Sequence, residues 1–216
     1  MTAKIHKKIL KKQLPADVEN AFVNIANAII DPSKNKMSIC LVAGSKHNEG
    51  ATFVSLNIAR TLARQIGGRI LWTDIHFQSE ILRSSVSSED SDSKVQSQYC
   101  GIDHSGIENL DLFLSDQWLG KPSEAVKISQ IQHFFDHVSG DYDYIIWDGK
   151  PINLYPDSRA FAAIADSVLL VAQAHKTRRE VIQKAKDSIV QRNGNFLGIV
   201  LNKRRFFIPN FIYRLL

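Results

Sequence analysis

The stretch MSICLVAGSKHNEGATFVSLNIARTLARQI (residues 37–66) decides the fold expected of this chain. Its first eight residues form an apolar run of strand length, and its last fourteen have the spacing of apolar positions typical of a helix. The loop KHNEGAT (46–52) joins the two. Strand, glycine-containing loop and helix in this order are typical of a phosphate-binding loop, which usually ends in Gly-Lys-Ser/Thr. Here the ending is Gly50-Ala51-Thr52, so the usual lysine is absent.

The rest of the chain continues the alternation of apolar strands and helices. Expected strands are 37–43, 69–75, 109–115, 141–148, 167–174 and 196–202, and expected helices are 18–30, 52–65, 122–138, 159–165 and 177–192. Near-continuous apolar strands separated by helices are typical of a parallel sheet that is covered on both faces. We therefore predict a doubly wound, mostly parallel α/β sheet in three layers: helices, sheet and helices.

Length and composition suit one large domain. The chain has 216 residues, of which 44% are hydrophobic and 23% charged. We expect the domain to span residues 17–205, with a basic N-terminal segment at 1–16 and an apolar tail at 206–216. The Ser-rich, acidic stretch 84–106 predicts a mobile surface loop. Two cysteines, no signal-peptide pattern and no apolar run near membrane-spanning length favour a reduced cytoplasmic setting.

Basic residues concentrate at the two ends of the chain. Residues 1–14 and 203–216 together carry nine lysines and arginines and no acid, so of the net charge of +5 the intervening residues carry about −4. This distribution argues against a nucleic-acid-binding groove across the body of the domain. It indicates that the two basic ends are the regions that contact a partner or a surface.

Each end combines basic with apolar residues. Ile5, Ile9, Leu10 and Leu14 fall on one face of a helix, which suits an amphipathic helix at an anionic membrane or an acidic partner, and a frayed basic tail is the alternative. The C-terminal FFIPNFIYRLL (206–216) is expected to dock on its own sheet or to bind a membrane or a membrane-protein partner.

The loop and two strand-end acids together predict a nucleotide site. Backbone N–H groups and the N-terminus of the helix point at the phosphates in such loops. Gly50 keeps the backbone approach open, and Thr52 can bind Mg²⁺ through its hydroxyl. Asp148 ends an apolar strand and suits the acid that holds Mg²⁺ through water, and Asp74 is a second candidate acid. ATP or ADP with Mg²⁺ is therefore the expected ligand, although strand-end aspartates also often cap the next helix.

Several longer stretches carry a family resemblance. These are VENAFVNIANAI, NEGATFVSLNIARTLA, ILWTDIHF, YDYIIWDGKPI, ADSVLLVAQAHKTRREV and LGIVLNKRR, in this order. The chain resembles the cytosolic domain of bacterial tyrosine kinases of capsule and exopolysaccharide synthesis, within the Min-type and ParA-type P-loop ATPases. The likeness covers about residues 17–209. It implies a P-loop NTPase fold, a place at the cytoplasmic side of the inner membrane, and a membrane-embedded chain-length regulator or export component as partner.

The resemblance also implies roles for individual residues. The residues implied to contact the nucleotide are Glu49, Gly50, Ala51, Thr52, Phe53 and Asn202, the last at the position of an adenine-contacting asparagine. Thr52 and Asp148 would bind the metal, and Asp74 and Asp148 would be catalytic if the protein is active.

Four departures from the family pattern predict a changed role. Ala51 stands in place of the loop lysine, and His76 in place of the second acid of an Asp-x-Asp motif. Val23 and Ala26 align with two arginines that build a ring in the family, and Tyr213 alone stands for the tyrosine cluster of the tail. We therefore expect a degenerate P-loop protein, a pseudo-ATPase or pseudokinase, for which a ring is not expected and a dimer is left open.

Two lysines offer an alternative. Lys46 lies where Min and partition ATPases carry a signature lysine that reaches a phosphate across a dimer, and Lys150 is close to Asp148 in sequence. Either ammonium could replace the missing charge and give an active ATPase or tyrosine autokinase. A partition-type ATPase is a further alternative. Trp72 and Trp147, near the two acids, are expected either to pack over the loop or to fill part of an abandoned phosphate pocket.

Overall fold

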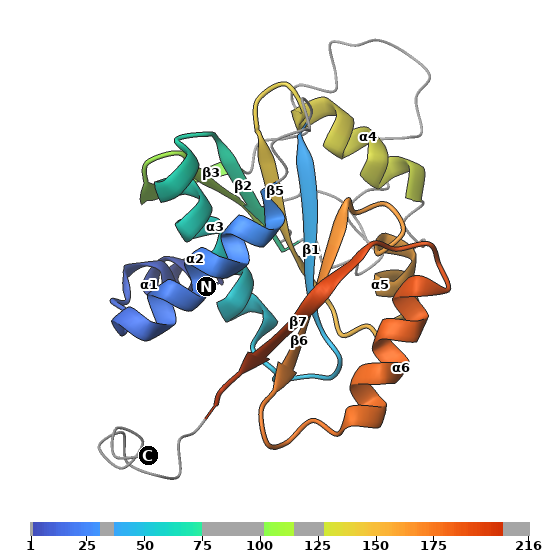
Figure 1. Cartoon of the computed structure of the whole chain (residues 1–216). Coiled ribbons are helices and arrows are strands. Elements are labelled where there is room, and N and C mark those ends of the chain that lie inside the picture. The colour runs from blue at the N-terminus through green and yellow to red at the C-terminus, as the bar shows by residue number, and fades with distance from the viewer. Residues whose placement is uncertain (1, 31–36, 75–101, 115–127, 205–216) are drawn as a thin grey trace, which may run out of the picture.

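A computed structural model of the chain describes residues 2–30, 37–74, 102–114 and 128–204. The strands are β1 (Ser38–Gly44), β2 (Ile70–Thr73), β3 (Ile102–Ile107), β4 (Leu110–Phe113), β5 (Tyr144–Gly149), β6 (Ser167–Gln173) and β7 (Phe196–Asn202). The helices are α1 (Thr2–Lys11), α2 (Ala16–Ile29), α3 (Ala51–Ile66), α4 (Ile128–Val138), α5 (Pro156–Phe161) and α6 (Arg179–Val190). Within the described residues the strands form one sheet in the order β3-β4-β2-β5-β1-β6-β7 (Figure 1).

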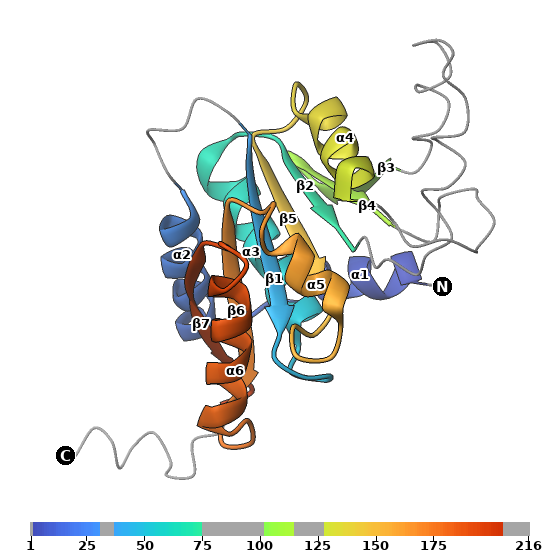
Figure 2. The same ribbon diagram turned by 90° about the vertical axis from the view of Figure 1, so that its right-hand side faces the viewer.

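The sheet lies between two layers of helices, as Figures 1 and 2 show. α1, α2 and α3 cover one face, and α4, α5 and α6 cover the other. All strand pairs are parallel except β3 with β4. The predicted fold class, a doubly wound and mostly parallel α/β sheet in three layers, is confirmed.

The two tryptophans belong to opposite halves of the hydrophobic core. Trp72 packs in the half under α1, α2 and α3, and its indole N–H donates to Ser55 Oγ (2.9 Å). Trp147 packs in the other half, where its ring centroid lies 5.0 Å from that of Phe161. Both side chains are fully buried. The alternative that they fill an abandoned phosphate pocket is therefore wrong.

The register of the sheet brings the two strands of the expected site together. β1 lies between β5 and β6, and Val42 of β1 pairs with Asp148 of β5. The loop that leaves β1 therefore emerges at the carboxyl ends of its two neighbours. Ligands of open α/β sheets bind at this edge, where strand order reverses.

The N-terminal segment is part of the packed structure. Leu10 and Leu14 are buried in the core half under α1, α2 and α3, and the imidazole of His6 lies 4.7 Å from the Trp72 ring. Arg60 of α3 donates from Nη1 to the carbonyl oxygens of Leu10 (3.3 Å) and Lys12 (2.9 Å). The frayed-tail alternative is wrong, and the apolar face of α1 is occupied by the protein's own core.

One strand contradicts the prediction for the Ser-rich stretch. Residues 102–106, expected within a mobile loop, belong to β3, whereas 84–101 lie outside the described residues. A two-residue turn at 108–109 joins β3 to β4, with Asn109 at φ 61°. Because β3 is a polar edge strand, it lacks the apolar run that identifies the other strands.

Other predictions fall outside the described residues. They concern His76, Tyr213 and the tail 206–216. None of the helices in the described part of the chain is both long and apolar enough to cross a bilayer.

Candidate functional site

Glycine is required at the last position before α3. Gly50 has φ 90°, in the left-handed region that a side chain disfavours. A Cβ at this position would overlap with Asn202 Nδ2. The loop can therefore turn into α3, and β7 can approach it closely, only because residue 50 has no side chain.

The loop is held by the carboxylate of Glu49, which is only 3% exposed. Ser45 Oγ lies 2.9 Å from both carboxylate oxygens, and the Lys46 N–H donates to Oε2 (2.8 Å). Thr177 Oγ1, between β6 and α6, donates to Oε1 (2.5 Å). The Glu49 side chain therefore fixes the shape of its own loop, and the nucleotide contact that the resemblance implied for Glu49 stays a prediction.

Thr52 and Asp148 form the metal side of the expected site. Thr52 Oγ1 donates to Asp148 Oδ2 (2.6 Å), and Asp148 is 1% exposed. Burial, together with the charge of Asp74, raises the pKa of Asp148 to about 7, although the hydrogen bond from Thr52 opposes the rise. Oδ1 of Asp148 has no hydrogen-bond partner among the described residues. A buried carboxylate oxygen without a partner, beside a hydroxyl, fits Mg²⁺, which prefers oxygen ligands.

Asp74 lies at the end of β2 and is 6% exposed. Its N–H donates to the Phe113 carbonyl (3.4 Å). β2 pairs with β5 in parallel with Thr73 opposite Trp147, so Asp74 and Asp148 follow at neighbouring positions, and the charge of Asp74 contributes to the raised pKa of Asp148. The structure therefore brings the two predicted acids to the same edge of the sheet.

The end of β7 holds the loop from the other side. Asn202 Nδ2 donates to the Glu49 carbonyl (2.9 Å), and Asn202 Oδ1 accepts from the Lys203 N–H (2.8 Å). Lys203 Nζ donates to the Asn48 carbonyl (2.5 Å). Both polar atoms of the Asn202 amide thus have a partner within the protein, and the adenine contact that the resemblance implied stays a prediction. The sequence prediction also missed Lys203, although a basic residue directly after a strand-end asparagine was a signal for it.

Lys46 and Lys150, the two candidates to replace the missing loop lysine, have different surroundings. Lys46 is partly exposed and contacts the site through its backbone N–H. The ammonium of Lys150 lies 5.1 Å above the centre of the Tyr155 ring, and that ring meets His47 of the loop edge-on at 5.6 Å. Burial lowers the pKa of Lys150, and the charge of Asp157 opposes this. The Lys150 ammonium therefore contacts Tyr155, beside His47 of the loop.

Phe53 and Ala51 occupy the first turn of α3. The Phe53 ring packs edge-on against Phe22 of α2, with centroids 6.2 Å apart. Only the backbone of Phe53 is then suited to the implied nucleotide contact. Ala51 is half-buried and presents a methyl group at the position of the family's lysine.

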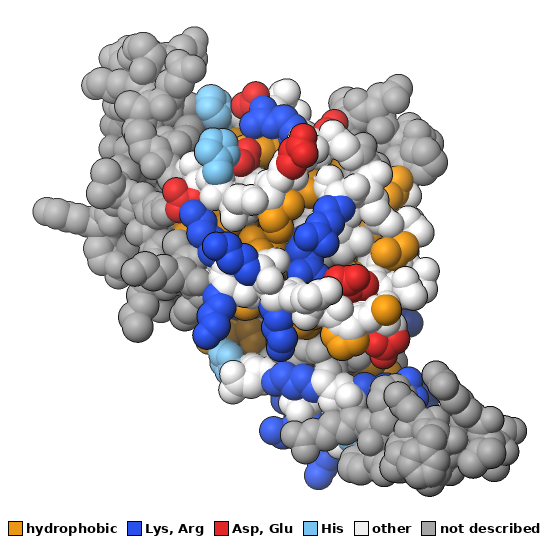
Figure 3. All heavy atoms as spheres, turned by 90° about the vertical axis from the view of Figure 1, so that its left-hand side faces the viewer, with side chains coloured by type: hydrophobic (Ala, Val, Ile, Leu, Met, Phe, Trp, Pro, Cys, Tyr) orange, Lys and Arg blue, Asp and Glu red, His pale blue; other side chains and the backbone are white. Residues whose placement is uncertain are grey.

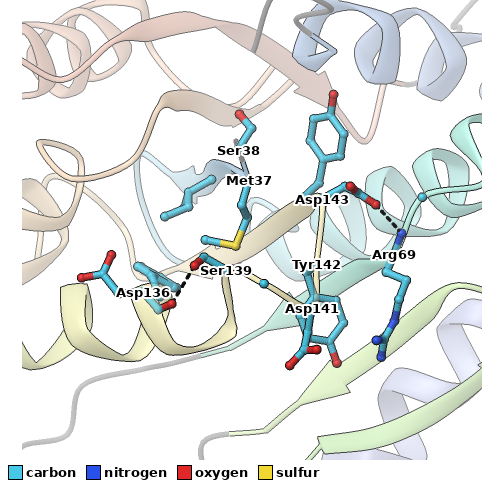
Figure 4. Close-up of a pocket in the computed structure, with 13 residues that line it drawn as sticks. Met37, Ser38, Arg69, Asp136, Ser139, Asp141, Tyr142 and Asp143 are labelled. Carbon is cyan, nitrogen blue, oxygen red and sulfur yellow. Dashed lines mark hydrogen bonds between the residues drawn. The ribbon is translucent and has the colours of Figure 1, made fainter. Parts of the chain in front are cut away.

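A cavity of about 1070 Å³ lies at the opposite end of the sheet (Figure 4). It is lined by the amino ends of β1, β2 and β5 and by the end of α4, and Figure 4 shows Tyr142 beside Arg69 in its wall. Asp143 Oδ2 there accepts from the Arg69 N–H (2.8 Å). None of the predicted site residues lines this cavity, so the expected nucleotide site is a separate place.

Comparison with curated proteins identifies relatives of similar length. No family model matches the chain. CapB of Staphylococcus aureus is 28% identical over 185 residues, covering 82% of this chain and 80% of CapB. The tyrosine-protein kinase CpsD of Streptococcus agalactiae is 24% identical over 189 residues (84% and 82%), and the tyrosine-protein kinase YwqD of Bacillus subtilis is 23% identical over 188 (84% and 78%). The predicted resemblance to bacterial tyrosine kinases is confirmed.

Solved structures agree on the fold. The chimerical protein CapA2B2 superposes with a TM-score of 0.71 at 20% identity, covering 93% of this chain and 91% of that one. The kinase domain of the Escherichia coli tyrosine kinase ETK gives 0.60 at 18% (88% and 78%), and a plasmid partition protein of Borrelia burgdorferi gives 0.52 at 18% (84% and 88%). The chain therefore has the P-loop NTPase fold that kinase domains and partition ATPases share.

Proposed function

We propose that this protein is a tyrosine-kinase-like P-loop protein that binds and regulates rather than catalyses. It would act in the cytoplasm, peripheral to the inner membrane, in the assembly or export of a capsular polysaccharide or exopolysaccharide. One observation carries the proposal: Ala51 occupies the start of α3 in a loop that otherwise keeps the pairing of Thr52 with Asp148. The similarity to CapB, CpsD and YwqD supports the biological setting.

The remaining groups favour binding over turnover. Backbone N–H groups at the start of α3 would face the phosphates, and Thr52 and Asp148 would hold Mg²⁺, which neutralises phosphate charge when bound. A fixed cation that stabilises the transition state contributes a few kcal/mol, so its loss slows turnover roughly a hundredfold or more. A weakly bound nucleotide would then serve as a structural ligand and not as a substrate.

The proposed partner is a membrane-embedded chain-length regulator or another export component. The likeness to the chimerical protein CapA2B2 and to other tyrosine kinase domains supports this partner. The absence of ring arginines supports a dimer or monomer instead of a ring, because Ala26, aligned with one of them, is fully buried in the core under α2.

Turnover and partner binding test the proposal together. We expect the wild-type protein to hydrolyse ATP and to phosphorylate itself at a rate roughly a hundredfold or more below that of Ala51→Lys. Ala51→Gln, a long side chain without charge, is the matched control and should stay inactive. All three proteins should bind the detergent-solubilised regulator equally. A wild-type rate equal to that of Ala51→Lys would contradict the proposal.

An active ATPase or tyrosine autokinase is the second candidate. The unpartnered Oδ1 of buried Asp148 favours it, because that atom is suited to metal binding. In this case Lys46→Ala or Lys150→Ala should abolish a measurable wild-type turnover. A partition-type ATPase would instead form a dimer when ATP is added, and Lys46→Ala would prevent this.

A further inference from the structure

The helix α1 has two chemically different faces. Its apolar face is used within the protein, since Leu10 is 3% exposed and His6 is stacked on Trp72. Lys8 and Lys11 are three positions apart, lie on the opposite side of the helix and are exposed, as is Lys12 directly after it. The helix therefore presents a row of lysines to the outside while its other side is anchored.

Neighbouring residues extend the positive charge. Arg64 of α3 is exposed. Burial lowers the pKa of Arg60, whose guanidinium holds the end of α1, and the charge of Arg64 lowers that pKa further. Figure 3 shows basic side chains gathered in a band across this side of the molecule, with acidic ones towards its margins. The acids on adjacent elements are Asp17 and Glu19 in the first turn of α2, Asp103 of β3 and Glu108 in the β3–β4 turn.

We propose that this α1 lysine face (Lys8, Lys11 and Lys12) docks the protein on an anionic membrane surface. Because the apolar side of α1 is occupied by the core, the attraction is electrostatic and does not require insertion of the helix. A lysine near an anionic leaflet contributes about 1 kcal/mol, and salt screens the attraction within about 10 Å. Binding should therefore be reversible and strongly dependent on salt.

A lipid surface fits this face better than an acidic protein. Lys8 and Lys11 lie on one side of α1, Lys12 follows directly after it, and residues 1–14 contain no acid, which provides uniform charge and no polar pattern for a specific partner. The choice also rests on the proposed function, which puts the protein beside a membrane-embedded regulator. Docking through α1 would keep the protein at the membrane before it meets that regulator.

Vesicle sedimentation with the full chain tests the proposal. The probes are vesicles of equal parts phosphatidylcholine and phosphatidylglycerol, and vesicles of phosphatidylcholine alone. We expect binding to the anionic vesicles only, with a loss at high salt. The triple variant Lys8→Gln, Lys11→Gln, Lys12→Gln should bind roughly a hundredfold more weakly, since three lysines are lost. Its fold should be unchanged, because Arg60 binds backbone carbonyls at the end of α1.

A second triple variant controls for net charge. Lys176→Gln, Lys184→Gln, Arg192→Gln removes the same charge from exposed positions on and beside α6, in the other layer of helices, and should retain wild-type binding. Equal loss in both variants, or no binding of the wild type to anionic vesicles, would overturn the proposal. Binding to polyglutamate without binding to vesicles would also overturn it, in favour of an acidic protein. Capture of the solubilised regulator, measured without lipid vesicles, tests the proposed function separately.

Discussion

The two sides of the phosphate-binding loop differ in what they keep. On the metal side, Thr52 of α3 donates to Asp148 of β5, and a buried carboxylate oxygen has no partner among the described residues. On the other side, Ala51 replaces the family's cation, and Asn202 and Lys203 of the β7 end bind loop carbonyls. One side is thus prepared for an ion, whereas the other is closed by the protein's own hydrogen bonds.

This difference teaches how a nucleotide loop can lose turnover without losing its shape. The loop conformation depends on Gly50 and on the buried carboxylate of Glu49, and neither needs a lysine at position 51. The loop geometry is therefore maintained by groups that are independent of the missing cation. Each of the following substitutions changes one side and leaves the other intact.

The largest effect is expected at Asp148. Its pKa is raised from 3.8 to about 7 in the folded protein, so the folded state binds a proton more tightly than the unfolded state does. The stabilisation by the protonated form is complete below about pH 4 and is lost as pH rises through about 7. Asp148→Asn, which stays neutral, should be more stable than wild type at pH 8 by at most about 4 kcal/mol, with little difference at pH 4.

Urea unfolding at pH 4, 6 and 8 measures this effect. Mg²⁺ should stabilise the wild type at pH 8 and leave Asp148→Asn unchanged, because the ion favours the ionised carboxylate. Asp157→Asn, at an exposed position, is the control and should follow the wild type. A wild-type stability that does not fall between pH 4 and 8, relative to that of Asp148→Asn, would show that the metal side is not as described.

A smaller effect is expected at Asn202. Asn202→Ala removes the donor to the partly buried Glu49 carbonyl and should destabilise the protein by about 1–2 kcal/mol. Hydrogen exchange should increase in the loop 45–52. Asn195→Ala is a matched control, because Asn195 Nδ2 donates to the Asp166 carbonyl (2.7 Å) just before β7 begins. Faster loop exchange in the control than in Asn202→Ala would contradict the role of the β7 end.

Thr52→Val removes the hydrogen bond to Asp148 and should destabilise the protein by about 1 kcal/mol at pH 8. The hydroxyl of Thr52 lowers the pKa of Asp148, so its removal should shift the pH-dependent loss of stability to a higher pH. The same urea series detects the shift. The account of the pairing fails if the midpoint of the pH dependence stays in place or falls.

The smallest effect is expected at Lys203. Its ammonium donates to the Asn48 carbonyl from an exposed position, so Lys203→Gln should cost about 0.5 kcal/mol or less. Hydrogen exchange at the loop should rise slightly, with Arg204→Gln as control. A loss above about 2 kcal/mol would show that Lys203 stabilises the fold far more than an exposed hydrogen bond does.

Apolar strands and strand-end acids were the part of the site that sequence could predict. Each parallel strand is a near-continuous apolar run, so its position and its carboxyl end follow from local pattern. Asp148 and Asp74 meet because parallel strands end at one edge of the sheet. By contrast, β3 was missed. It is a polar edge strand in which only one of the six side chains is buried, so it has no apolar run that would predict a strand.

The contacts that close the loop could not be predicted in the same way. Glu49 is bound by Thr177, and Asn48 by Lys203, and each pair joins segments more than a hundred residues apart in sequence. Which strand lies beside the loop is decided by the tertiary order of the sheet. The side-chain hydrogen bonds of Glu49 and Asn202 within the protein were therefore not predictable from local pattern, and the nucleotide contacts that the resemblance implied for these residues stay a prediction.

Calorimetric titration of the wild type and Ala51→Lys with ATP, each with and without Mg²⁺, tests the central claim most directly. The account predicts weak wild-type binding that requires Mg²⁺, and binding roughly a hundredfold tighter in Ala51→Lys, because the restored cation completes the phosphate side. Equal affinity in the two proteins, or wild-type binding that does not depend on Mg²⁺, would contradict it.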